Sequence, residues 1–167
     1  MGLGLFFFKL INREYYKTIP LGLLVLNWIT QRIFKINSEV PFSVHYTSKV
    51  SGFNYINIDE RSKLSFGVSG GAYIVATQEA PIHIGKNVIF AFNFCIQTIN
   101  HDFLNRNIYT HKPVRIGDNC WFGNSVSVLP GVTLGNNVTV GANSVVTKSF
   151  PDNVVIAGCP AKIIKTI

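Results

Sequence analysis

One histidine stands beside a carboxylate in a segment that could carry chemistry. The run is Asn100-His101-Asp102-Phe103, and the His101 ring is the group there that changes charge near neutral pH next to an acid. A positioned imidazole can act as a general base that takes the proton of an attacking hydroxyl, which contributes about 10²–10⁴ in rate. Asp102 either holds the tautomer of the ring or caps a turn, and both roles stay open.

The remaining candidates offer no competing chemistry. Nothing places His45, His83 or His111 at a site, and His83 is expected on the outward side of a strand. The sequence holds no GxSxG, HExxH, P-loop or GxGxxG motif. Its three cysteines have no CxxC spacing, which argues against a zinc knuckle or a disulfide framework and fits a reducing compartment. We therefore expect a site without a metal.

A six-residue repeat surrounds His101 and must position it. Two common periods do not explain this pattern, because a helix needs apolar residues about 3.6 apart and an alternating strand would run through turn formers. A short strand followed by a turn, with three units to a coil of 18 residues, fits the spacing. The apolar residues at every sixth position are Ile116, Phe122, Val128, Leu134, Val140 and Val146, preceded by Ile84, Phe90 and Ile96 and, further upstream, by Ile58 to Leu64.

This geometry predicts where the side chains point and where the regularity breaks. The residue at the head of each unit should point inward, and Gly and Asn should form the corners, where positive φ is tolerated. After Ile96 the phase resumes at Ile116 instead of position 102, so 14 residues are inserted. An insertion in a solenoid usually projects as a loop and carries function. We expect this loop at about residues 97–113, with His101 on it.

The repeat resembles the hexapeptide-repeat acyltransferases, and residues 97–103 and 113–123 resemble their sugar and polysaccharide O-acetyltransferase branch. The resemblance implies an all-β fold, a left-handed parallel β-helix, and association as a homotrimer. It implies that acetyl-CoA is the donor and that the histidine of the inserted loop is the catalytic base, with Asn100 and Asp102 beside it. The acetyl group would pass directly to a hydroxyl of a sugar or envelope-polysaccharide precursor, with no covalent intermediate.

The segments 140–151 and 155–162 resemble the coenzyme A groove of the same family. Small side chains suit such a wall, because a thin pantetheine arm must reach the backbone; Ala142 would equally suit a corner of the fold, and Trp121 would equally suit ordinary packing. Lysines near the mouth would act as point charges for the phosphates. The implied donor-binding residues are Trp121 near the thioester, Asn124 and Ala142 along the pantetheine, Thr147 and Lys148 near the adenine and pyrophosphate, and Lys162 and Lys165 near the phosphates.

The charge and the N-terminal segment bear on partners. The chain has 15 Lys and Arg against 8 Asp and Glu, a net charge of +7, which suits an anionic ligand or a membrane surface. The basic residues form no long run and no nucleic-acid-binding signature, so no nucleic-acid partner is expected. Residues 1–50 are predicted to be a helical cap and lead-in, with two short helices broken at Pro20, and residues 51–167 the β-helix domain. Capping of the open end is favoured, because a solenoid needs a cap.

A second role for this segment stays open, which is docking on an anionic membrane through Phe6-Phe7-Phe8 and nearby basic residues. No signal peptide or spanning helix is expected, so the predicted location is the cytoplasm, with peripheral contact at the inner face of the membrane as the open addition. Two other functions remain open. One is N-acetylation of an amino sugar or nucleotide sugar, and the other is a catalytically silent β-helix that serves as a scaffold or binding module.

Overall fold

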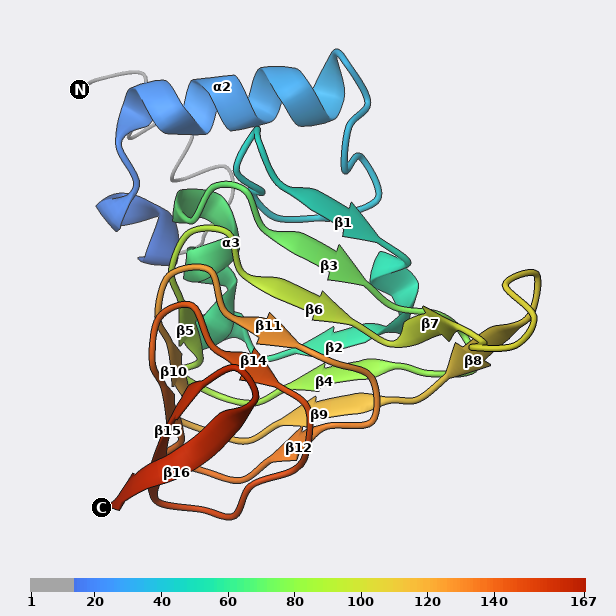
Figure 1. The fold of residues 1–167 in the computed structure, drawn as a ribbon. Helices are drawn as coiled ribbons and strands as arrows, with labels where there is room; N and C mark the ends of the chain where they lie inside the picture. Colours follow the sequence, from blue (N-terminus) through green and yellow to red (C-terminus); the bar gives the residue numbers. More distant parts are fainter. Residues whose placement is uncertain (1–13) are drawn as a thin grey trace.

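The chain winds into a three-sided parallel β-helix, shown in Figure 1. The computed structural model describes residues 14–167. The predicted all-β class, a left-handed parallel β-helix, is confirmed. Sheet A contains β1 (Lys49–Ser51), β3 (Tyr73–Val75), β6 (Cys95–Gln97), β11 (Ser127–Val128) and β14 (Val145–Val146). Sheet B contains β2 (Ile56–Ile58), β4 (Ile82–Ile84), β9 (Val114–Ile116) and β12 (Thr133–Leu134). Sheet C contains β5 (Ile89–Phe90), β10 (Trp121–Phe122), β13 (Thr139–Val140), β15 (Val154–Gly158) and β16 (Ala161–Thr166).

The head residues of the repeat form the core. Strands one coil apart pair in register, so that Ile96 lies beside Val128 and Val128 beside Val146. Burial removes their apolar surface from water, which is the main force that holds the coils together. Ile58 and Leu64, at the upstream end of the predicted phase, are only partly buried. The other predicted heads are buried, namely Ile84, Phe90, Ile96, Ile116, Phe122, Val128, Leu134, Val140 and Val146. The prediction of inward heads is therefore confirmed from Ile84 onward.

Asn and Gly have different roles at the corners of the coils. Asparagine, rather than glycine, takes most of the left-handed corner positions, because its short polar side chain tolerates positive φ. Gly117 follows a head residue and serves a different purpose: a Cβ there would lie 2.5 Å from the carbonyl oxygen of Gly135 in the next coil. Gly and Asn were both expected at the corners; glycine at positions such as Gly117 allows close stacking of the coils, and the positive φ is taken mostly by Asn. Positive φ near 55–60° occurs at Asn87, Asn93, Asn119, Ser125, Asn137, Asn143 and Asn153.

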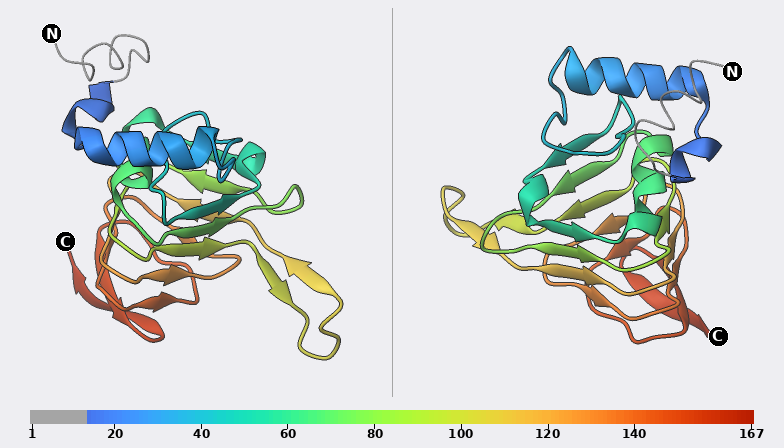
Figure 2. Two further views of the ribbon diagram at one scale, coloured as in Figure 1. Left: turned by 90° about the horizontal axis from the view of Figure 1, so that it is seen from above. Right: turned by 180° about the vertical axis from the view of Figure 1, so that it is seen from behind.

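The inserted segment is an antiparallel β-hairpin. Its strands are β7 (Ile99–His101) and β8 (Tyr109–His111), and the hairpin leaves the prism at the corner between sheets A and B. Two contacts hold its base, since the backbone N–H of Lys112 donates to the carbonyl of Thr98 at 2.9 Å and His111 Nδ1 lies 2.9 Å from the hydroxyl of Thr77. The hairpin projects well clear of the coils in both figures (Figures 1 and 2).

In the first coil a helix replaces a strand. The repeat predicts a strand unit reaching Leu64, but α3 (Lys63–Val68) occupies that side of the prism. Two serines at this helix make the hydrogen bonds that a strand would have made to the edge of β5. Ser65 Oγ accepts from the backbone N–H of Phe90 at 3.2 Å, and Ser69 Oγ donates to the Phe90 carbonyl at 2.6 Å. Side chains thus satisfy a strand edge that would otherwise be exposed or unpaired.

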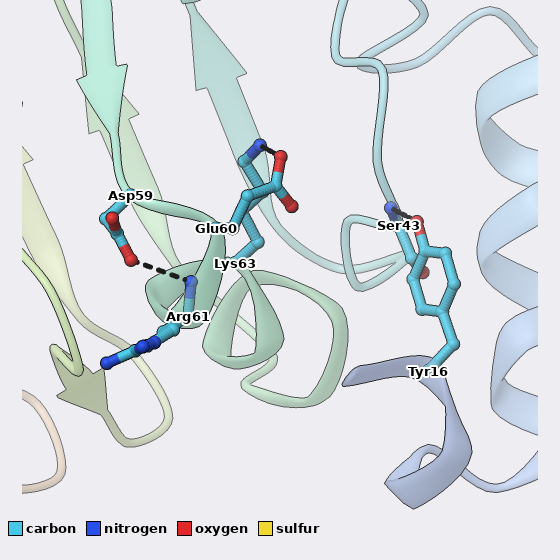
Figure 3. A network of polar contacts seen from close by, with 6 residues as sticks. All are labelled: Tyr16, Ser43, Asp59, Glu60, Arg61 and Lys63. Atoms are coloured by element: carbon cyan, nitrogen blue, oxygen red, sulfur yellow. Dashed lines mark hydrogen bonds and ion pairs between the residues drawn. The ribbon is translucent and has the colours of Figure 1, made fainter. Parts of the chain in front are cut away.

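Local polar contacts set up α3, as Figure 3 shows. The short helix η3 (Glu60–Ser62) precedes it, after η2 (Phe53–Tyr55) earlier in the coil. Asp59 Oδ1 caps η3 by accepting from the backbone N–H of Arg61 at 3.0 Å. Lys63 and Glu60 form an ion pair one turn apart. The turn that redirects the chain into α3 is therefore built from neighbouring residues.

The N-terminal segment closes the first edge of sheet A. It contains η1 (Glu14–Thr18) and α2 (Leu21–Arg32), which confirms a break at Pro20. Asn37 completes the edge of β1, since its side-chain amide donates to the Ser48 carbonyl and accepts from the Val50 N–H, both at 2.8 Å. The Phe6-Phe7-Phe8 segment lies outside the described residues. A domain boundary near residue 50 stays a prediction.

One end of the prism is covered by a helix, and at the other end the edge of sheet C is paired. Figure 1 shows α2 lying across one end. At the other end β16 turns back antiparallel to β15, so the last parallel strand does not end in an open ladder. Within residues 14–167, no helix is both long enough and apolar enough to cross a membrane.

Candidate functional site

His101 ends β7 and is exposed on the hairpin. Its Nδ1 lies 2.6 Å from the backbone carbonyl of Arg106 across the hairpin tip. A carbonyl oxygen only accepts, so Nδ1 carries the proton and Nε2 is left with the lone pair. The ring also packs on Tyr109, with centroids 4.6 Å apart. The hairpin therefore fixes both the tautomer and the plane of the imidazole.

Asp102 caps the turn that follows. Its Oδ1 accepts from the backbone N–H groups of Leu104 at 2.9 Å and Asn105 at 3.0 Å. Hydrogen bonds from the backbone of Asn105 and then Leu104 lower the pKa of the carboxyl below its ordinary value, because they favour the charged form. Of the two roles left open for Asp102, the turn cap is the one that the structure shows. The tautomer of His101 is held by the backbone carbonyl of Arg106, and a backbone group cannot be identified from residue types.

The rest of the hairpin is internally braced. Asn100 Oδ1 accepts from Gln97 Nε2 at 3.3 Å, and the Thr110 hydroxyl donates to the Asn100 carbonyl at 3.3 Å. Arg106 Nη1 donates to the Asp102 carbonyl at 3.0 Å, which ties the two sides of the tip together. Asn100 thus lies next to His101 on the same strand but is used in local bonds. Its part in catalysis stays a prediction.

Two of the predicted donor-binding residues share one column of sheet C. Trp121 pairs with Thr139, Thr139 with Val155, and Val155 with Lys165. Side chains in such a column point to the same face, so Trp121 and Lys165 lie three strand spacings apart, about 14 Å. Lys162 is also on β16, paired with Ala157. This column extends from an exposed aromatic ring to the exposed Lys165, and the exposed Lys162 lies on the same strand outside the column.

Two more predicted residues stack at the corner between sheets C and A. The backbone N–H of Asn143 donates to the Asn124 carbonyl at 2.8 Å, which places Asn124 beside Ala142 in the next coil. A Cβ at Gly123 would lie 2.7 Å from the Ala142 nitrogen, so the two coils are in close contact here. Both Asn124 and Ala142 are exposed. A thin ligand could reach the backbone at this corner.

Thr147 and Lys148 lie elsewhere. They follow β14 at the corner between sheets A and B, the same corner from which the hairpin leaves two coils earlier. Both side chains are exposed, and Lys148 Nζ lies 5.7 Å from the centre of the Phe150 ring. The residues assigned to one groove therefore fall on two different corners and one face of a single chain.

The hairpin and sheet C lie on opposite sides of the prism, as Figure 1 shows. His101 projects from the corner between sheets A and B, whereas Trp121 lies on the side opposite that corner. A single chain thus does not bring the candidate base to the Trp121–Lys165 column. The tip of the hairpin also presents Phe103 and Leu104, which are 87% and 98% exposed.

Several features of this region were not predicted. Arg106 contributes through its backbone, which no residue pattern signals. His111 lies 3.8 Å from Glu79 as well as beside Thr77, which ties the hairpin to residues 77–79.

Within the described residues, no group of three or more His, Cys, Asp and Glu could hold a metal ion. Burial raises the pKa of Cys120 to about 11, so this thiol stays protonated.

Comparison with known proteins agrees with the repeat. Residues 113–148 match a family model described as bacterial transferase hexapeptide, six repeats. The galactoside O-acetyltransferase of Escherichia coli K12 is 41% identical over 90 residues, 52% of this chain and 44% of that protein. The candidate lipopolysaccharide biosynthesis O-acetyl transferase WbbJ of Escherichia coli K12 is 39% identical over 146 residues, 77% of this chain and 72% of that protein.

A solved structure shares the same architecture. It is a hexapeptide-repeat acetyltransferase of Vibrio cholerae O1 biovar eltor in complex with acetyl coenzyme A, with a TM-score of 0.53 and 28% identity over 71% of this chain and 67% of that chain. The present chain spans about half the length of the galactoside O-acetyltransferases that it matches.

Proposed function

The chain belongs to the bacterial hexapeptide-repeat transferases, and on that premise we propose that it moves an acetyl group from acetyl-CoA to a hydroxyl of a sugar or envelope-polysaccharide precursor. The observation that carries the proposal is the bond from His101 Nδ1 to the Arg106 carbonyl, which leaves Nε2 free to act as a base. Relatives named for galactoside and lipopolysaccharide O-acetylation support the acceptor class, and the acetyl-CoA complex of a related structure supports the donor.

The proposed reaction is a direct transfer. Nε2 of His101 takes the proton of the acceptor hydroxyl, and the oxygen attacks the thioester carbonyl. Backbone N–H groups stabilise the negative charge on the carbonyl oxygen. The C–S bond then breaks, the acetyl group stays on the acceptor oxygen, and the coenzyme A sulfur leaves with the proton held by the imidazolium. No acyl-enzyme is formed.

We propose that the complete site lies between copies in a homotrimer. One chain holds His101 on the side opposite Trp121, so a base from one copy must meet the sheet C face or neighbouring corner of another. The nearly fully exposed Phe103 and Leu104 at the hairpin tip favour the same arrangement, because large apolar side chains at such exposure usually contact a partner. Lys162 and Lys165 would then receive the phosphates of the donor.

We place the reaction in the cytoplasm. The three cysteines are free, and Cys159 is exposed, which fits a reducing compartment.

The test compares His101→Ala with His83→Ala, a matched change at a histidine on the outward side of sheet B. Coenzyme A release is followed with acetyl-CoA and a panel of neutral sugars, amino sugars and nucleotide sugars. We expect His101→Ala to lower turnover about 10²–10⁴-fold with unchanged melting temperature, and His83→Ala to keep wild-type turnover.

The chemistry of the product separates the outcomes. An O-acetyl ester is removed by mild base, whereas an N-acetyl amide is not. A base-stable product would show that the acceptor group is an amine and not a hydroxyl. Near-wild-type turnover of His101→Ala would refute the base, and the lack of any coenzyme A affinity would indicate a silent β-helix.

A further inference from the structure

The helix α2 differs from an ordinary surface helix in the residues that it buries completely. A surface helix usually turns its apolar stripe towards the core and its polar face towards water. In α2 the fully buried positions are polar, namely Asn27 and Gln31, which are 0% and 4% exposed. Several apolar side chains face outward, among them Leu21, Val25 and Trp28, while Leu23 and Leu24 pack partly against the core. The outward side of α2 is thus a candidate contact surface.

The buried polar residues hold α2 in place by hydrogen bonds. Asn27 donates to the Ser43 hydroxyl at 2.9 Å and accepts from the Tyr46 N–H at 2.9 Å. Gln31 donates to the Phe42 carbonyl and accepts from the Val44 N–H, both at 3.0 Å. The orientation of the helix is therefore fixed by several directional bonds, so the exposure of its apolar side follows from the fold.

The outward side of α2 and the residues after it carry several exposed apolar side chains, which we call the α2 surface. Leu21, Val25 and Trp28 are at positions i, i+4 and i+7, so they line one stripe of the helix. Exposed apolar residues also follow the helix, and Phe34 is the most exposed of them at 68%. The α2 surface includes the exposed side chains of Leu21, Val25, Trp28, Ile33, Phe34 and Ile36.

Basic residues interrupt the end of this surface, and no acidic residue does. The run is Arg32-Ile33-Phe34-Lys35-Ile36, with every side chain exposed. No Asp or Glu occurs between residues 21 and 36, and the next carboxylate along the chain is Glu39. Basic side chains around exposed aromatic and aliphatic groups complement a layer of anionic lipid headgroups over hydrocarbon. A partly exposed Trp also suits that interface, because its ring is apolar with one polar N–H.

We propose that the α2 surface docks the protein on an anionic lipid bilayer. The helix has 12 residues, which is too short to cross a bilayer and suits a helix lying in the plane of the headgroups. Its position across the end of the prism leaves its long outer side free of the coils (Figures 1 and 2). This inference stands apart from the acetyl transfer, since it uses no residue of the proposed site.

The test is co-sedimentation of the full chain with vesicles of phosphatidylcholine, with and without phosphatidylglycerol. We expect binding to the anionic vesicles, weakened by salt. Trp28→Ser and Phe34→Ser should each lower the partition coefficient about tenfold, because an exposed apolar side chain loses its place in the bilayer. The matched control is Ile164→Ser, which is 66% exposed on β16 and should bind like the wild type. Lys35→Glu should weaken binding, whereas Lys86→Glu, at an exposed corner, should not.

Other occupants give different results. If the wild type ignores anionic vesicles, or if Ile164→Ser loses as much binding as Phe34→Ser, the proposal fails. If Phe34→Ser instead reduces the size of the assembly in analytical ultracentrifugation and vesicles have no effect, a second copy covers the surface. A Trp121→Phe variant leaves Trp28 as the single tryptophan. If its emission is already shielded from iodide without vesicles, another part of the chain covers it and the proposal is overturned.

Discussion

At the residue scale, the orientation of His101 depends on the backbone rather than on the neighbouring acid. The Arg106 carbonyl fixes the Nδ1 proton, and Asp102 holds the turn that brings this carbonyl into place. The sequence pointed to His101 through its type and its place in an insertion. It left the role of Asp102 open, because the choice depends on the turn geometry and not on adjacency.

This assignment predicts a difference between two substitutions of Asp102. Asn keeps an oxygen that can accept from Leu104 and Asn105, whereas Ala removes it. We expect Asp102→Asn to keep most of the turnover and Asp102→Ala to lower it at least tenfold with little change in the affinity for acetyl-CoA. Steady-state kinetics with acetyl-CoA varied would check this. Equal losses for both variants would show that the charge, and not the cap, is required.

His45 predicts how stability depends on pH. Burial lowers the pKa of this histidine below its ordinary value of 6.5, so the folded state binds the proton less readily than the unfolded chain. Stability should therefore be complete above pH 6.5 and fall as the pH decreases through that value towards the folded pKa. Melting temperatures measured from pH 8 to pH 5 should decrease, with a smaller decrease for His45→Gln. An unchanged slope in that variant would assign the effect to other groups.

At the element scale, side chains complete the edges of the first coil. The Asn37 side chain makes the hydrogen bonds of a neighbouring strand at the edge of β1, and Ser65 and Ser69 make them at the edge of β5. Each of these bonds satisfies a backbone group at a ladder end, which would otherwise be unpaired or open to another chain.

Replacing Asn37 should therefore be costly. Asn37→Ala removes two buried hydrogen bonds at a residue with φ of 57°, so we expect a loss of about 3 kcal/mol in the free energy of unfolding. Asn54→Ala, at an exposed asparagine, is the matched control and should change stability by less than about 0.5 kcal/mol. Urea unfolding of both variants would decide. Similar small effects would mean that the edge of β1 does not depend on Asn37.

The elements show what the sequence could and could not predict. The hexad heads were readable because burial repeats with the coil, as at Val128 and Val146. The helix α3 was missed because Leu64 keeps the apolar phase of the repeat while its neighbours form helical bonds. The hairpin was predicted as a loop only, since its cross-strand pairs, such as His101 with Tyr109, have no period to detect. The burial of polar residues of α2 depends on bonds to residues 42–46, which lie outside any local pattern.

At the scale of the whole molecule, the hairpin with the candidate base and the Trp121–Lys165 column face opposite ways. Resemblance assigned both to one groove, but the spacing along a single chain cannot say which copy supplies each part. The topology separates them by placing the hairpin at one corner and Trp121 on the side opposite it.

A site shared between copies predicts rescue by mixing. His101→Ala and the double variant Trp121→Ala/Lys165→Glu should each be inactive alone. After joint unfolding and refolding at equal amounts, about a quarter of the sites in a symmetric ring would combine an intact histidine with an intact column, so about a quarter of the activity should return. Coenzyme A release from the mixture measures this. No recovery would show that one chain contributes both parts.

The spacing between Trp121 and Lys165 is fixed by the strand repeat of sheet C. Each coil adds one strand to sheet C, so the distance between the aromatic ring and the lysine changes only in whole steps. Removing one coil of 18 residues, the separation of Val128 and Val146, would bring the two ends closer by about 4.8 Å while leaving both end groups intact. Under the proposed function, in which this column holds the donor, a change in the distance between the ring and the lysine takes a whole coil and not a side-chain substitution.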